Sequence, residues 1–250
     1  SVRRKNSTCV ATTTLNLSNR TICGNVYQDA NGMSDNTING TAFTPPSTLY
    51  AVLYNTTTNL VEQKQTISNT GTFSLTANST SNYNVIITNI NATIGATTAP
   101  NSILPSRWVT TGKQVGTATG TLTGNLAIPI SNLNVQVYIG LQMKSKADTI
   151  THTLNTTPAY NTPLLLNGVG NNPPILRGSD PEDQPTKGPL TNKQVVITSI
   201  PTNGDLMYND TKISEVPYII NSYVPELLSY KLLSLSAVQT SFNYAYIDRA

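Results

Sequence analysis

Oxygen-bearing side chains occupy alternate positions in a short stretch near the start of the chain. Asp29, Asn31 and Asp35 lie in this stretch, and Gly32 between them permits a left-handed turn. A tight loop that wraps oxygen atoms round a hard cation needs this pattern. The sequence therefore predicts a Ca²⁺ site made of these three side chains and the Met33 carbonyl. The alternative is an Asx-type loop that hydrogen bonds close without an ion.

A second group of carboxylates follows a proline-rich stretch. Asp180, Glu182 and Asp183 surround Pro181. The group resembles the acidic motif of cadherin-like repeats, in which linker carboxylates bind Ca²⁺ and stiffen the joint between domains. That resemblance implies a second Ca²⁺ site, whereas the alternative is a charged, solvated turn fixed by Pro181.

Residues typical of catalysis are sparse. The single histidine, His152, lies in a polar stretch, and the chain has no nucleophile elbow, zinc-protease motif or nucleotide-binding loop. The few carboxylates form no obvious pair for glycoside hydrolysis, although a fold can assemble such a pair in space. We therefore predict a protein that is not an enzyme.

The two cysteines are Cys9 and Cys23. A turn-like segment separates them, so they could pair between neighbouring strands in an oxidising, extracellular setting. The alternative is that both remain buried thiols.

The composition favours strands and turns over long helices. Only 11% of the 250 residues are charged, the formal net charge is +3, and the chain has 15 Gly and 15 Pro among many Thr, Asn and Ser. The one dense basic cluster, Arg3, Arg4 and Lys5, has no interleaved aromatics, so we expect no nucleic-acid partner. No apolar run is long enough to span a membrane, and no signal peptide is recognisable.

Short apolar runs with turn residues between them predict antiparallel β-sandwiches. We expect an all-β chain with residues 1–21 as the end of a preceding module or an exchanged strand, and with sandwiches over residues 22–145 and 146–250. Asn203 and Gly204 lie between two strand-like runs, 194–200 and 205–208, which predicts a hairpin there.

Four stretches resemble a known family. Residues 26–41 and 104–112 resemble the opening and the late segment of SdrD-B or Cna-B-like repeats in large surface proteins of Bacteroidota, although Lys113 stands where an acidic residue is usual. Residues 178–183 and 197–209 resemble the cadherin-like module that often follows. The resemblance implies tandem immunoglobulin-like or prealbumin-like β-sandwiches.

The resemblance also implies a function. Such modules belong to long adhesins of the SprB type, which work in gliding motility and are exported by type IX secretion, so we expect an internal, non-catalytic segment of an extracellular cell-surface protein. Its partners would be other modules of the same chain, neighbouring subunits, or a surface glycan or protein ligand. Two alternatives are a filament subunit assembled by strand exchange around residues 9–17 and a carbohydrate-binding module that uses Trp108 and the tyrosines.

Overall fold

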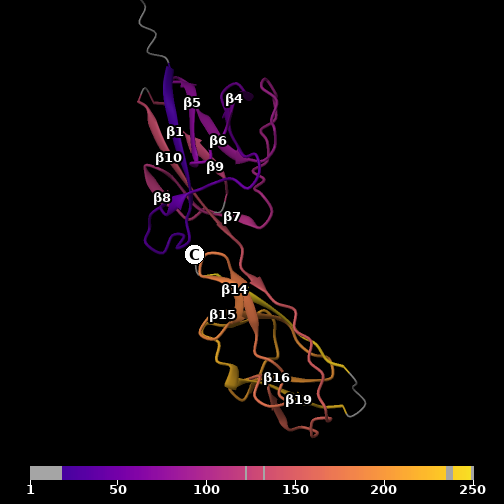
Figure 1. The fold of residues 1–250 in the computed structure, drawn as a ribbon. Helices are drawn as coiled ribbons and strands as arrows, with labels where there is room; N and C mark the ends of the chain where they lie inside the picture. The colour runs from indigo at the N-terminus through magenta and orange to yellow at the C-terminus, as the bar shows by residue number, and fades with distance from the viewer. Residues whose placement is uncertain (1–18, 122, 132, 235–238, 249–250) are drawn as a thin grey trace, which may run out of the picture. The chain divides into compact units, whose positions relative to one another are not determined.

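The computed structural model describes residues 19–121, 123–131, 133–234 and 239–248 (Figure 1). The fold is all-β, with 46% of residues in strands, almost no helix and several antiparallel sheets, none of them closed. One turn of 3₁₀ helix, η2, spans Pro225–Leu227. The all-β prediction is thus confirmed.

The chain divides into two compact units, which we describe separately. The first unit contains the described residues up to Asp29, together with Asn36–Ser106 and Thr110–Leu141. The second contains Ala30–Asp35, Arg107–Val109 and the described residues from Gln142 onward.

The larger sheet of the first unit is built round its first strand. Neighbouring strands follow the order β2, β1, β10, β7, β8, and β5 also pairs with β1. The bounds are β1 (Asn19–Gln28), β2 (Thr41–Ala42), β5 (Thr72–Asn78), β7 (Trp108–Val115), β8 (Thr117–Thr119) and β10 (Val135–Met143).

A second sheet of this unit has four strands in the order β4, β3, β6, β9. They span β3 (Tyr50–Asn55), β4 (Leu60–Thr66), β6 (Tyr83–Thr88) and β9 (Asn125–Ile128). Edge strand β5 of the larger sheet is protected by side chains of β4, because Gln65 Oε1 accepts from Ser74 N at 2.6 Å and Gln63 Oε1 accepts from Thr76 N at 2.8 Å.

Strand β1 departs from the expected antiparallel pattern. It runs antiparallel to β5 but parallel to β10, with Ile22 opposite Val135 and Gln28 opposite Leu141. Parallel neighbours need a long crossover, and most of the first unit lies between these two strands. Local alternation of apolar residues cannot reveal such a pairing.

Close packing at Gly24 positions β1 against β5. Gly24 lies opposite Phe73, and a Cβ built on this glycine would fall 1.9 Å from Phe73 Cζ. Ile22 and Val26, on either side of Gly24, are fully buried on the same face. The phenyl ring therefore uses the space that the missing side chain leaves.

The second unit has three sheets, in the orders β11-β13-β14, β12-β19-β16-β17 and β18-β15-β20. The strands span β11 (Lys146–Ala147), β12 (Pro163–Leu165), β13 (Arg177–Asp180), β14 (Gln184–Pro189), β15 (Gln194–Ser199), β16 (Gly204–Tyr208), β17 (Thr211–Lys212), β18 (Tyr218–Ile220), β19 (Leu228–Leu232) and β20 (Asn243–Ile247). Buried apolar residues of the sheets β12-β19-β16-β17 and β18-β15-β20, among them Leu206 and Val195, form one core cluster, and Leu190, which follows β14, joins it.

The predicted hairpin at Asn203–Gly204 is wrong. Both strands exist, but β15 pairs with β18 and β20, whereas β16 pairs with β19 and β17. Asn203 is tied to β19 instead, because the Tyr230 hydroxyl lies 3.2 Å from its carbonyl oxygen and 3.1 Å from its Oδ1. The segment therefore leads the chain from one sheet to another.

Candidate metal centre

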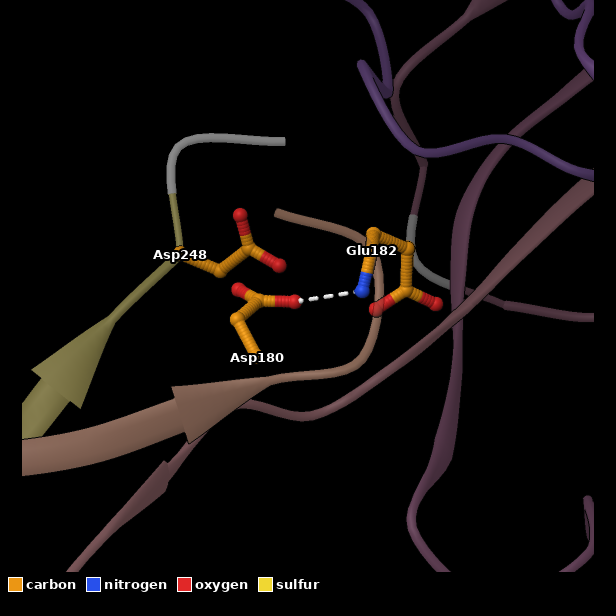
Figure 2. A group of neighbouring side chains, drawn as sticks. All are labelled: Asp180, Glu182 and Asp248. Carbon is orange, nitrogen blue, oxygen red and sulfur yellow. Dashed lines mark hydrogen bonds between the residues drawn. The ribbon is translucent and has the colours of Figure 1, made fainter. Parts of the chain in front are cut away.

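Three carboxylates of the second unit converge at one point (Figure 2). Asp180 is the last residue of β13, Glu182 lies in the turn that follows, and Asp248 follows β20. Each offers a carboxylate oxygen, and these oxygens all lie within 4.8 Å of one another. We call these three residues the acidic cluster.

Strand pairing brings the two parts of the acidic cluster together. Strand β13 pairs with β11, and the hydroxyl of Tyr244 in β20 contacts the backbone beside this pair. It lies 2.7 Å from the carbonyl oxygen of Asp148, which follows β11, and 2.9 Å from that of Arg177 in β13. Burial raises the pKa of the Tyr244 hydroxyl, which keeps it a hydrogen-bond donor. The ends of β13 and β20 therefore lie side by side.

Asp180 is the most constrained member of the acidic cluster. Its side chain is fully buried, at 0% exposure. One carboxylate oxygen, Oδ1, accepts a hydrogen bond of 3.1 Å from the Glu182 backbone N–H, while Oδ2 has no hydrogen-bond partner among the described residues. Figure 2 shows this carboxylate next to that of Asp248, with Glu182 to one side. A buried carboxylate oxygen without a donor is costly unless a cation satisfies it.

A further buried oxygen belongs to Gln142, which is 5% exposed. The Gln142 amide Nε2 donates to Asp248 Oδ2 at 2.9 Å, and its Oε1 has no hydrogen-bond partner. Beside it, the Met143 backbone N–H donates to Glu182 Oε1 at 3.0 Å. The acidic cluster is thus joined to Gln142 and Met143, with which the second unit's main run of chain begins.

The chemistry of the donors selects among metals. All candidate ligands are oxygen atoms of the three carboxylates, whereas zinc sites are dominated by histidine and cysteine. Ca²⁺ takes six to eight oxygen ligands in flexible geometry, and Mg²⁺ keeps more of its water. The residues present therefore fit a hard cation, with Ca²⁺ first.

The structure brings together two of the predicted ligands of this site. Asp180 and Glu182 belong to the acidic cluster. Asp183 does not belong to it and is exposed to solvent. Sequence reasoning missed Asp248. It is the last acidic residue of the chain and follows a strand-like run, but only the pairing of β20 with β15 shows where it lies.

The predicted loop near the start of the chain has a different character. Asp29 is fully buried, and its Oδ2 accepts a hydrogen bond of 2.8 Å from Thr111 Oγ1. Asn31 and Asp35 are exposed, and Met33 is half-buried. Calcium binding by these residues stays a prediction.

The remaining predicted features are placed as follows. Cys23 is a free, half-buried thiol in β1, while Cys9 and the strand expected around it lie outside the described residues, so the disulfide stays a prediction. His152 is exposed, and its Nε2 lies 3.0 Å from the Asn171 carbonyl oxygen.

Comparisons of the chain with protein-family models, with curated proteins and with solved structures find no match. In the part of the chain that the structure describes, no helix has the length and apolar character needed to cross a bilayer. The fold and the site together define an all-β chain with an oxygen-only candidate cation site.

Proposed function

We propose that this chain is a non-catalytic, adhesive or structural segment of a long secreted cell-surface protein, and that its second unit binds Ca²⁺ at the acidic cluster. The observation that carries the cation site is the fully buried Asp180, whose Oδ2 lacks a hydrogen-bond partner beside two further carboxylates. A bound cation would offset both the burial of that charge and the repulsion among the three carboxylates.

The wider role is inferred from the fold class and the sequence motifs. Both units consist of short, mostly antiparallel strands round apolar residues, which is compatible with tandem immunoglobulin-like β-sandwiches. The motifs at residues 26–41, 104–112, 178–183 and 197–209 resemble adhesin repeats of the SprB type. That family would place the chain at the cell surface, exported by type IX secretion, with gliding motility as its setting.

In such a protein the modules do mechanical work. They hold a distal adhesive surface away from the cell, and each must stay folded while the chain is under tension. A cation that links segments distant in sequence stabilises the folded module, because it binds the native arrangement of ligands and not the unfolded chain. This gives the acidic cluster a function without any catalytic step.

Thermal unfolding in Ca²⁺ and in chelator tests the cation site. At a free Ca²⁺ concentration of 100 times the dissociation constant, binding adds about 2.7 kcal/mol to stability. For a unit of this size, that corresponds to a rise of roughly 10 °C in melting temperature. We expect the rise in the wild type and its loss in Asp180→Asn.

A matched control lies in the same turn. Asp183→Asn removes an equal charge from an exposed position outside the acidic cluster. This variant should keep the full response to Ca²⁺. Identical melting curves with Ca²⁺ and with chelator for the wild type would rule out the site, and equal losses in both variants would show that only general charge matters.

Glycan binding is a second candidate for the first unit. The rings of Tyr27 and Tyr138 are stacked with centroids 6.1 Å apart, and beside them Gln136 Nε2 donates to Asn25 Oδ1 at 2.8 Å. Aromatic rings with neighbouring amides suit sugar faces and hydroxyl groups. A glycan array should show binding that Tyr138→Ala abolishes, and an array without any positive glycan would exclude this role for the glycans tested.

A further inference from the structure

We infer that the acidic cluster is a cation-dependent clamp that holds strand β20 to the segment through which the chain enters the second unit. This incoming segment consists of the four residues from Gln142 to Ser145. The inference rests on the proposed cation site and adds what that site controls: release of β20 from the unit.

Contacts between the incoming segment and the end of the unit are specific. Gln142 Nε2 donates to Asp248 Oδ2 at 2.9 Å, across 106 positions in sequence. Ser145 Oγ donates to the Tyr246 carbonyl oxygen at 2.7 Å. Residues 142–145 and 246–248 of the second unit therefore lie side by side.

The acidic cluster sits at this junction. Glu182 accepts a hydrogen bond from the Met143 backbone N–H, and Asp248 accepts one from Gln142, so two of the three carboxylates already hold the incoming segment. The third, Asp180, ends β13, whose partner β11 directly follows that segment. A cation bound here would link β13, the end of β20 and, through Glu182 and Asp248, the incoming segment.

Strand β20 depends on this junction because of its place in the fold. It pairs with β15 on one side only, from Gln194 opposite Ile247 to Ser199 opposite Asn243, and it ends the path β18-β15-β20. Its pairing shifts register between Ile197 and Ser199. An edge strand has fewer backbone hydrogen bonds to break than a central one, so contacts at its end contribute strongly to the free energy of its release.

The cation state sets the strength of these contacts. Carboxylates whose oxygens lie within 4.8 Å of one another repel, and a bound cation would replace this repulsion with a link between Asp180 and Asp248. With a cation, β20 cannot leave until the bond to Asp248 breaks.

Gln142 offers a way to separate the clamp from the site. Its Oε1 is buried without a hydrogen-bond partner, and its Nε2 holds Asp248, yet it carries none of the charge that attracts the cation. Replacing Gln142 with leucine keeps much of its buried volume and removes the link. The three carboxylates remain in place to bind Ca²⁺.

Hydrogen exchange of the full chain, followed by mass spectrometry in Ca²⁺ and in chelator, tests the clamp. We expect Ca²⁺ to slow exchange of β20 amides tenfold or more in the wild type, with a smaller change in β16 and β19 of the same unit. In Gln142→Leu, Ca²⁺ binding measured by calorimetry should persist, whereas the protection of β20 should fall at least threefold.

Each outcome bears on a different step. Ca²⁺ binding with equal slowing of β16, β19 and β20 would overturn the clamp and leave the cation site, because it would show stabilisation of the whole unit. Unchanged β20 protection in Gln142→Leu would also overturn it. Absence of Ca²⁺ binding in the wild type would remove the proposed site itself, and the clamp with it.

Discussion

Substituting alanine for Gly24 should destabilise the first unit through one ring. The new Cβ would lie 1.9 Å from Cζ and 2.2 Å from Cε1 of Phe73, far inside van der Waals contact. Phe73 is only 4% exposed, so its ring has little room to move away. Overpacking of this kind costs about 1–3 kcal/mol. In a strand, alanine is about 0.5–1 kcal/mol more favourable than glycine. Because the overlap is severe, we expect a net decrease of about 2 kcal/mol in the free energy of unfolding.

A double-mutant cycle isolates the contact. Phe73→Ala alone should cost about 3–5 kcal/mol, because it leaves a cavity in the core. In Gly24→Ala/Phe73→Ala the ring that opposed the new methyl group is gone, so the double variant should be no less stable than Phe73→Ala. The coupling free energy between the two sites is then about 2–3 kcal/mol in the direction of rescue.

Urea unfolding of the full chain, monitored by far-ultraviolet circular dichroism, measures these differences. Ser74→Ala on the same strand is the control, since Ser74 is exposed and a surface change should stay within about 0.5 kcal/mol. Strictly additive losses would refute the reasoning, because they would show that the methyl group and the ring do not compete for space. Stabilisation by Gly24→Ala would refute it as well.

Three further predictions concern buried polar groups. Burial raises the pKa of Tyr223, so above the ordinary tyrosine pKa of 10.0 the folded state keeps a proton that the unfolded chain loses. The free energy of unfolding should therefore fall as the pH rises above 10.0. Urea titration should show a less steep fall in Tyr223→Phe. Thr111→Val should lower the free energy of unfolding by about 1–3 kcal/mol, because it removes a hydrogen-bond donor to the buried Asp29. The decrease should be equal in Ca²⁺ and in chelator, whereas a decrease seen only in Ca²⁺ would support a cation at Asp29. Arg20→Met should leave thermal stability unchanged or raise it. Among the described residues, the buried guanidinium makes one hydrogen bond, from Nη2 to the Pro129 carbonyl oxygen at 2.6 Å, while Nε and Nη1 have no partner. A loss of stability above about 2 kcal/mol would contradict this prediction.

Local sequence patterns predicted features that depend on neighbours along the chain. The alternation of apolar residues around Ile22 and Val26 indicates a strand with one buried face, which β1 has. Asp180 and Glu182 could be recognised together because one residue separates them. In each case the physical cause, the period of a strand or the reach of a turn, acts over a few residues.

Sequence patterns did not predict which distant strands pair. The Asn203–Gly204 turn has the composition of a hairpin, but the partners of β15 and β16 are decided by burial in a core to which both of their sheets contribute. The parallel pairing of β1 with β10 and the arrival of Asp248 beside Asp180 have the same origin. No local propensity encodes which distant strand lies alongside, because packing of the whole unit determines it.

The scarcity of charge in this chain makes the acidic cluster hard to explain as an incidental feature. The chain has 12 acidic residues among 250, and three of them meet within 4.8 Å, one being fully buried. Like charges at this distance repel one another and destabilise the fold. The chain is rich in threonine, serine and asparagine, and such uncharged residues could occupy these positions without the repulsion. A bound cation would offset the burial of Asp180 and the repulsion among the three carboxylates. The place of the acidic cluster between the incoming segment and β20 then makes the stability of that junction depend on the surrounding cation concentration.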